Sequence, residues 1–241
     1  LLEPHQISDD IRRIADSLTG DIQRILVRKG HHWISTLNTA AASARGERLI
    51  FLEKNLAPLK GWLACLNKAF STHGNKKAFG GRICDTSGRI IGSGMVVDRN
   101  NAPVPAYHHL FVAFPPACKE RSFQMVDLML AVEKDLFVQA GGFTPSAGPY
   151  WLMDLCLKIH CKTDDPDTIA YLPDLRMIQL ALPSQSTDRD SAVYFYSRWH
   201  SRLWTSEDAL YRSDGISPQD LSHARLAAAM QSAGQTIIPN A

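Results

Sequence analysis

The stretch LMLAVEKDLFVQAGGFTPSAGPYWLMDLCLKIHC, residues 128–161, determines the predicted fold. Its first five residues form a short apolar run, which predicts a buried strand. Acidic residues at 133 and 135 then begin a helix, because the helix dipole favours negative charge in the first turn. Gly141 and Gly142 end that helix, since glycine adopts the left-handed cap conformation at little cost. After a turn rich in proline and glycine, a second helix is predicted from about Tyr150.

Strands and helices alternate in the residues before this stretch. The predicted elements are a helix from Ser8 to Gly20, a strand at 22–27, a helix at 32–45 and a strand at 48–52. This rhythm favours a parallel sheet with helices on both faces. Ligands bind beyond the carboxyl ends of the strands in such sheets, so the polar residues that follow Leu52 become candidates for a site.

The remaining segments give weaker predictions. Residues 78–97 predict a hairpin with a turn at 85–88. Residues 98–127 contain four prolines and little periodicity, which predicts a long irregular loop. A short strand is predicted at 169–172, and aromatic residues beyond about 183 indicate further helices.

The composition indicates a soluble globular protein whose fold needs no disulfide bond or structural metal. The chain has 241 residues, 45% of them hydrophobic and 21% charged, and its net charge of +2 gives no argument for nucleic acid or a membrane surface. Its five cysteines form no C-x-x-C pair, which argues against zinc and favours reduced thiols in the cytoplasm. No apolar run approaches the ~20 residues that span a bilayer. The chain begins on Leu1-Leu2 as if inside a strand, which indicates a fragment or one domain of a longer protein.

The 128–161 stretch resembles the family 2 glycosyltransferases. Their pattern here is a small apolar strand, L-F, G-G-F and an acidic E-D-x-D-L-C-x-R run, and this chain has 131-AVEKDLF-137, 141-GGF-143 and 154-DLCLK-158. The resemblance implies an α/β fold: a GT-A-like three-layer sandwich with a mostly parallel mixed sheet over residues 1–182. It also implies a helical C-terminal extension over residues 183–241.

The resemblance also implies a nucleotide-sugar donor, a glycan acceptor and a divalent metal, Mn or Mg. The implied donor-binding residues match the family's D-x-x-S-x-D, G-F-x-x-x-x-N and metal-binding D-x-D-like segments, and they are Glu3, Asp10, Asn38 and Glu53. The implied metal ligands are Glu53 and Asn55. The implied acceptor-binding residues are Gly142, Phe143 and Trp151.

The sequence departs from the family at the acidic positions. The segment Glu53-Lys54-Asn55 offers one carboxylate and one amide, which predicts weak or absent metal binding. Trp151 and Leu152 occupy the positions of the E-D pair and cannot accept a proton. Asp154 is then the catalytic candidate, although two helical positions turn a side chain by about 200°.

Two functions therefore stay open. The first is a sugar transferase of polysaccharide or glycoconjugate assembly, cytoplasmic, with peripheral attachment to a membrane left open. The second is a degenerate, non-catalytic domain with a binding or scaffolding role. Three of the site residues also have a structural alternative: Asp154 as a helix-start acid, Glu53 as a solvated carboxylate, Trp151 as packing. We predict very low or absent transfer activity, and we expect Leu152→Asp to raise it more readily than Asp154→Asn abolishes it.

Overall fold

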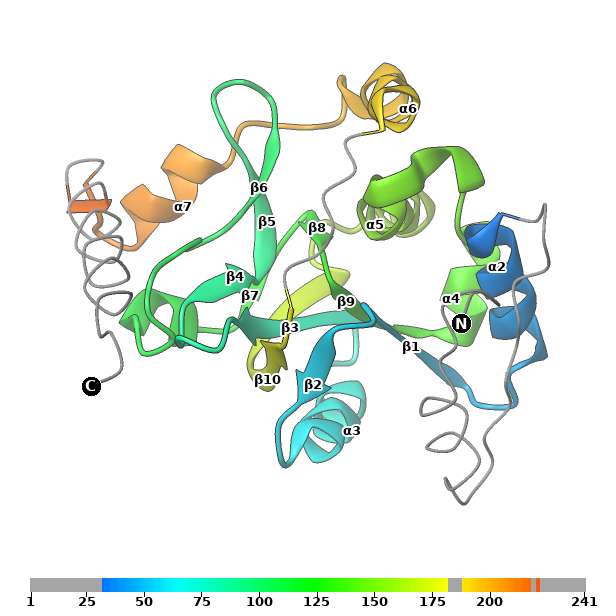
Figure 1. Cartoon of the computed structure of the whole chain (residues 1–241), viewed down its shortest axis with the longest axis horizontal. Coiled ribbons are helices and arrows are strands. Elements are labelled where there is room, and N and C mark those ends of the chain that lie inside the picture. Colours follow the sequence, from blue (N-terminus) through cyan, green and yellow to red (C-terminus); the bar gives the residue numbers. More distant parts are fainter. Residues whose placement is uncertain (1–31, 182–187, 218–219, 222–241) are drawn as a thin grey trace, which may run out of the picture.

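A seven-stranded mixed sheet forms the centre of the protein (Figure 1). The computed structural model describes residues 32–181, 188–217 and 220–221, so the elements predicted within residues 1–31 lie outside it. The strand order is β1-β9-β3-β10-β2, with β4 beside β3 and β7 beside β10. The bounds are β1 Arg48–Leu52, β2 Leu56–Pro58, β3 Ala78–Cys84, β4 Ile90–Gly92, β7 Arg121–Ser122, β9 Met129–Glu133 and β10 Ile169–Gln179.

The prediction of neighbouring strands at 48–52 and 128–132 is confirmed. Strands β1 and β9 pair with Leu49 opposite Val132 and Leu52 opposite Met129. The expectation of a mostly parallel sheet is wrong for the described strands, because β3 and β10 form their one parallel pair. Strand β9 lies between β1 and β3 and runs opposite to both. The alternation of strands and helices along the chain does not reveal that an antiparallel strand lies between β1 and β3.

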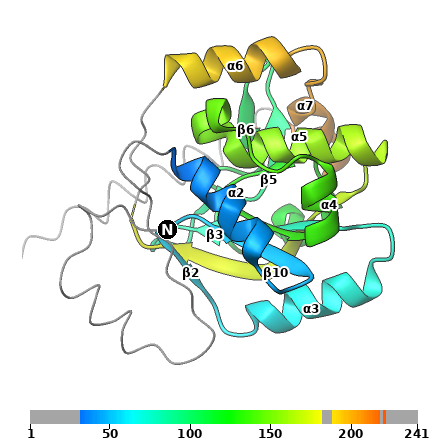
Figure 2. The same ribbon diagram turned by 90° about the vertical axis from the view of Figure 1, so that its right-hand side faces the viewer.

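Both faces of the sheet are covered by helices (Figure 2). Met129 and Ala131 of β9 pack in the cluster that contains Leu66 of α3 (Trp62–Thr72). Leu130 and Val132 point to the opposite face, as the period of two in a strand requires, and share a cluster with residues of four helices. Those helices are α2 Trp33–Ser43, α4 Lys134–Gln139, α5 Trp151–Thr163 and α6 Arg189–Trp199. Burial on both faces explains why β9 reads as a continuous apolar run.

Three strands that follow β4 in the sequence form a second sheet. Its order is β6-β5-β8, with β5 at Gly94–Val97, β6 at Pro103–Pro105 and β8 at Met125–Val126. The predicted turn at 85–88 is present, and the Asp85 carboxylate accepts hydrogen bonds from the backbone N–H groups of Ser87 and Arg89. Residues 98–127, predicted as an irregular loop, also contain the 3-10 helix η2, Pro115–Cys118.

Strand β10 is longer than the sequence predicts. The prediction ended at Leu172 because a proline follows, but the strand continues to Gln179. Its register with β3 shifts between Leu172 and Arg176, and Pro173 lies within this irregularity. A proline at a bulge removes no ladder hydrogen bond, so the strand passes through it.

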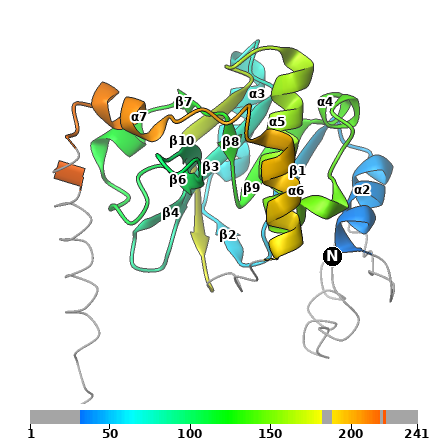
Figure 3. The same cartoon turned by 90° about the horizontal axis from the view of Figure 1, so that it is seen from above.

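Two helices follow the sheet, α6 at Arg189–Trp199 and α7 at Glu207–Ser213. Helix α6 packs on the 3-10 helix η3, Pro145–Tyr150, where the rings of Tyr150 and Phe195 stack with centroids 4.6 Å apart. Phe195 is fully buried in the same cluster as α5. The predicted boundary between residues 182 and 183 stays a prediction. Figure 3 shows that the end of β10 and the starts of α2 and α6 lie on one side of the molecule.

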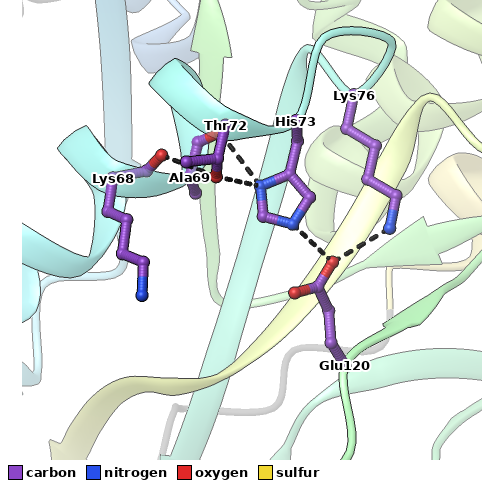
Figure 4. A network of polar contacts seen from close by, with 6 residues as sticks. All are labelled: Lys68, Ala69, Thr72, His73, Lys76 and Glu120. Carbon is purple, nitrogen blue, oxygen red and sulfur yellow. Dashed lines mark hydrogen bonds and ion pairs between the residues drawn. The ribbon is translucent and has the colours of Figure 1, made fainter.

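A polar network joins the end of α3 to the chain before β7 (Figure 4). The Glu120 carboxylate lies 2.8 Å from Nε2 of His73 and 2.9 Å from Nζ of Lys76. Nδ1 of His73 is 3.0 Å from the Ala69 carbonyl in the last turn of α3. The network therefore fixes the far end of the sheet, away from the carboxyl edge of β3 and β10.

Candidate functional site

Two acidic residues, Glu53 and Asp127, lie near one another where β1 ends and β9 begins. The backbone N–H of Glu53 donates to the Leu128 carbonyl over 2.9 Å, which extends the β1–β9 ladder by one step. Leu128 has a left-handed φ of 65°, and its N–H donates to Oδ1 of Asp127 over 2.8 Å. This turn places Asp127 close enough for the charge of Glu53 to act on it. The sequence analysis missed Asp127, whose one signal is an acidic residue inside the apolar run 125–130.

Burial raises the pKa of Asp127 to about 6, and the negative charge of Glu53 adds to the rise while the Leu128 N–H opposes it. A folded-state pKa above the unfolded value means that the folded protein holds the proton more tightly. Asp127 therefore costs stability above pH about 6, and the cost fades as the pH falls towards about 4.

We expect Asp127→Asn to raise the free energy of unfolding by about 1–2 kcal/mol at pH 7 and by almost nothing at pH 4. The amide keeps the shape and removes the charge that burial disfavours. Urea titrations of both proteins across this pH range, in buffer with a chelator, measure the difference. An equal difference at both pH values would contradict the assignment.

The turn that carries Glu53 and Asn55 is held between two strands. The Glu53 carbonyl accepts a hydrogen bond from Leu56 N–H over 3.2 Å, and the Asn55 carbonyl accepts one from Leu180 N–H over 2.9 Å. Gln179, at the end of β10, is 6% exposed. Carboxylate and amide oxygens suit Mg²⁺ or Mn²⁺. Within the described ranges, however, no three or more His, Cys, Asp or Glu side chains gather as a metal site.

Asn38, a predicted donor-binding residue, contacts the G-G-F segment. Its Nδ2 donates to the Phe143 carbonyl and its Oδ1 accepts from the Phe143 N–H, both over 2.8 Å. Gly142 has a left-handed φ of 63°, and a Cβ there would lie 2.9 Å from Oδ1 of Asn38. The Asn38 amide therefore anchors the segment after α4 to α2, and its predicted role in donor binding stays a prediction.

We expect Asn38→Ala to lower the free energy of unfolding by about 2–3 kcal/mol, because both polar groups of the buried Phe143 backbone lose their partner. Thr39→Ala is the matched control, since Thr39 is the next residue of α2 and is exposed. Its effect should stay within about 0.5 kcal/mol. Chemical denaturation measures both, and equal effects would show that the Asn38 contacts contribute nothing.

Asp154, the predicted catalytic residue, is fully buried and links three elements. Its Oδ1 accepts a hydrogen bond from the Trp199 indole over 2.8 Å. Its Oδ2 lies 3.3 Å from Nζ of Lys158, too poorly aligned for a hydrogen bond. Lys158 also donates to the Gly142 carbonyl over 2.6 Å. Burial lowers the pKa of Lys158, and the Asp154 charge opposes that effect. These contacts fit the structural alternative, an acid that joins α6 to the G-G-F segment, and the catalytic role of Asp154 stays a prediction.

The predicted acceptor residues pack against one another. Phe143 is 3% and Trp151 5% exposed, with ring centroids 4.8 Å apart in an edge-to-face arrangement. Phe51 of β1 contacts both rings, at 4.6 and 6.4 Å. Leu152 is fully buried. The packing alternative for Trp151 accounts for these contacts, and binding of an acceptor by Gly142, Phe143 and Trp151 stays a prediction.

Two hollows lie in different parts of the described structure. A hollow of about 270 Å³ adjoins the turn before α5, on the side where α2 and α6 begin, and is lined by His32, Pro145, Ser146, Asp188, Asp190 and Ser191. A larger one of about 590 Å³ lies between the end of β9, α4 and the loop after α5. The smaller hollow adjoins η3, which leads from the G-G-F segment into α5, so it fits the expected place of an acceptor better.

The mixed sheet between helical layers, with its candidate site at the strand ends, is a GT-A-like glycosyltransferase fold. The crystal structure of GalNAc-T7 with UDP, GalNAc and Mn²⁺ matches 90% of this chain at 15% identity and a TM-score of 0.54. The match covers 44% of that chain, so this chain spans less than half of its length. No protein-family model and no curated protein matches the sequence. None of the described helices is long and apolar enough to cross a membrane.

Proposed function

We propose that this chain is a glycosyltransferase domain that binds a nucleotide-sugar donor at the carboxyl edge of its sheet and passes the sugar to a glycan acceptor. The observation that carries the proposal is the placement of Glu53 and Asp127 near one another, where β1 ends and the antiparallel β9 begins, within a GT-A-like fold. The solved neighbour contains UDP, GalNAc and Mn²⁺, which makes a uridine diphosphate sugar the donor to test first.

Glu53, Asn55 and Asp127 supply oxygen ligands of the kind that a hard divalent cation prefers, and in our proposal they hold it. A cation bound there would neutralise the negative charge of the donor diphosphate. Lys54, which is exposed between Glu53 and Asn55, adds a positive charge close to the same phosphates. We expect the binding to be weak, because Asn55 contributes a neutral amide.

The second candidate is a domain that binds the nucleotide sugar without transferring it. Its support is the burial of Trp151, Leu152 and Asp154, the residues at the family's acidic run. A general base must reach the hydroxyl proton that it removes. The Asp154 carboxylate lies instead against Trp199 and Lys158, inside the protein.

Calorimetric titration with UDP, in Mn²⁺ and in chelator, tests donor binding. A UDP-release assay with UDP-GalNAc then tests turnover. Binding with release that depends on a glycan acceptor supports the transferase, and binding without release supports the second candidate. No UDP binding in either buffer would overturn both.

We expect Asn55→Asp to strengthen Mn²⁺-dependent UDP binding about tenfold, because a third carboxylate raises the charge of the ligand set. Asn75→Asp is the matched control. It adds the same charge at an exposed position beside the larger hollow, at the other end of the sheet. Tight Mn²⁺-dependent binding by the unmodified chain would contradict the expected weakness of the site.

A further inference from the structure

Arg82 of β3 is a buried cation without an acidic partner. The residue is 6% exposed, and its Nε has no hydrogen-bond partner. One terminal nitrogen donates to the Val112 carbonyl over 2.8 Å. Within the described residues, no carboxylate forms an ion pair with this guanidinium. Arginine is rarely buried unless an anion accompanies it, because its desolvation costs several kcal/mol.

The same terminal nitrogen of Arg82 lies 3.1 Å from Sγ of Cys118, at the end of η2. Sγ is 3.8 Å from the Val112 carbonyl, a long contact for a thiol hydrogen. Cys118 is exposed, so a reagent in solution can reach it. A thiolate at this place would give Arg82 the anion that it lacks.

The position of the sulfur is fixed by its surroundings. Tyr171 of β10 donates its hydroxyl hydrogen to the Ala117 carbonyl over 2.7 Å, and Ala117 is fully buried. The last turn of η2 is thereby held against the sheet, and Cys118 stays beside Arg82. Because the folded protein holds the sulfur beside the guanidinium, no rearrangement is needed before the sulfur reacts.

The other four cysteines lack this arrangement. Burial raises the pKa of Cys84 to about 11 and that of Cys156 to about 12, and it raises the pKa of the half-buried Cys65. Cys161, at the end of α5, is the other exposed cysteine, and no guanidinium nitrogen lies at its sulfur within the described structure. Cys161 is therefore an internal control for exposure.

We propose that Cys118 is a reactive thiol that Arg82 activates, and that it is a site of reversible modification by small disulfides such as oxidised glutathione. The Cys118 thiolate attacks one sulfur of the disulfide, a new sulfur–sulfur bond forms and the old one breaks. The second glutathione leaves as a thiolate, and the Cys118 proton passes to water. Cys118 is oxidised and the leaving glutathione sulfur is reduced, so the disulfide is the one oxidant required. This site is independent of sugar transfer.

The test treats the folded full chain with oxidised glutathione and follows each cysteine by peptide mass mapping. We expect Cys118 to be modified about tenfold faster than Cys161, because exchange depends on the thiolate. In Arg82→Met the Cys118 rate should fall to the Cys161 rate. Arg176→Met is the matched control, since Arg176 is the exposed arginine paired with Arg82 across β3 and β10, and it should leave the Cys118 rate unchanged.

Equal rates at Cys118 and Cys161 in the unmodified protein would overturn the proposal without any variant. Retained selectivity in folded Arg82→Met would overturn the role of Arg82. If Arg82→Met does not fold, the unmodified protein in urea replaces it. Loss of the Cys118 preference on unfolding then supports activation by the fold, and a preference that survives in urea refutes it.

Discussion

Asp154→Ala lowers the free energy of unfolding by about 3–5 kcal/mol in our expectation, because it leaves the ammonium of Lys158 buried without its partner. The Lys158 side chain is 11% exposed, and Asp154 is the one carboxylate paired with it in the described structure. The same change removes the acceptor of the buried Trp199 indole. The loss would be a large part of the 5–15 kcal/mol that stabilises a typical domain.

Two further variants separate the contacts of Asp154. Trp199→Phe keeps most of the ring packing and removes the indole N–H, so its cost should be about 1–2 kcal/mol. Asp167→Ala removes an exposed carboxylate and should change stability by less than about 0.5 kcal/mol. Urea denaturation monitored by fluorescence measures all three. If Asp154→Ala unfolds like Asp167→Ala but abolishes sugar transfer, then Asp154 is a catalytic residue and not a structural one.

The sequence predicts a strand or helix well where the residues that specify it lie within the element itself. The strand at 48–52 matches β1, and the double glycine after α4 has the left-handed φ values of 82° and 63° that its capping role requires. The helix from about Tyr150 begins at Trp151. Apolar periodicity and glycine caps act within one or two turns of chain, so they can be read without knowledge of the fold.

The parts that the sequence does not reveal depend on contacts between distant residues. The antiparallel placement of β9 between β1 and β3 depends on pairing with strands that lie far from it in the sequence. The partner of Asp154 is Trp199, 45 positions away along the chain. Asp127 becomes a candidate because β1 ends beside it, which brings Glu53 close.

The burial of Leu152 changes what its substitution can do. The sequence favours Leu152→Asp as a way to restore an acidic base, but Leu152 is fully buried among apolar residues of the main core. An aspartate there loses the packing of the leucine and places a carboxylate where water does not reach it. We therefore expect Leu152→Asp to cost at least about 4 kcal/mol at pH 7 and to leave much of the protein unfolded, with no gain in transfer.

Two controls isolate the buried charge of Leu152→Asp. Leu152→Met keeps the volume and should cost less than about 1.5 kcal/mol. Val138→Asp adds the same charge on α4 at a residue that is 59% exposed, and it should be nearly neutral. Burial raises the folded-state pKa of an introduced carboxylate, so the cost at 152 should shrink as the pH falls towards the unfolded value of about 4. A stable Leu152→Asp protein with increased UDP release would instead show that this position can open to the acceptor and act as a base.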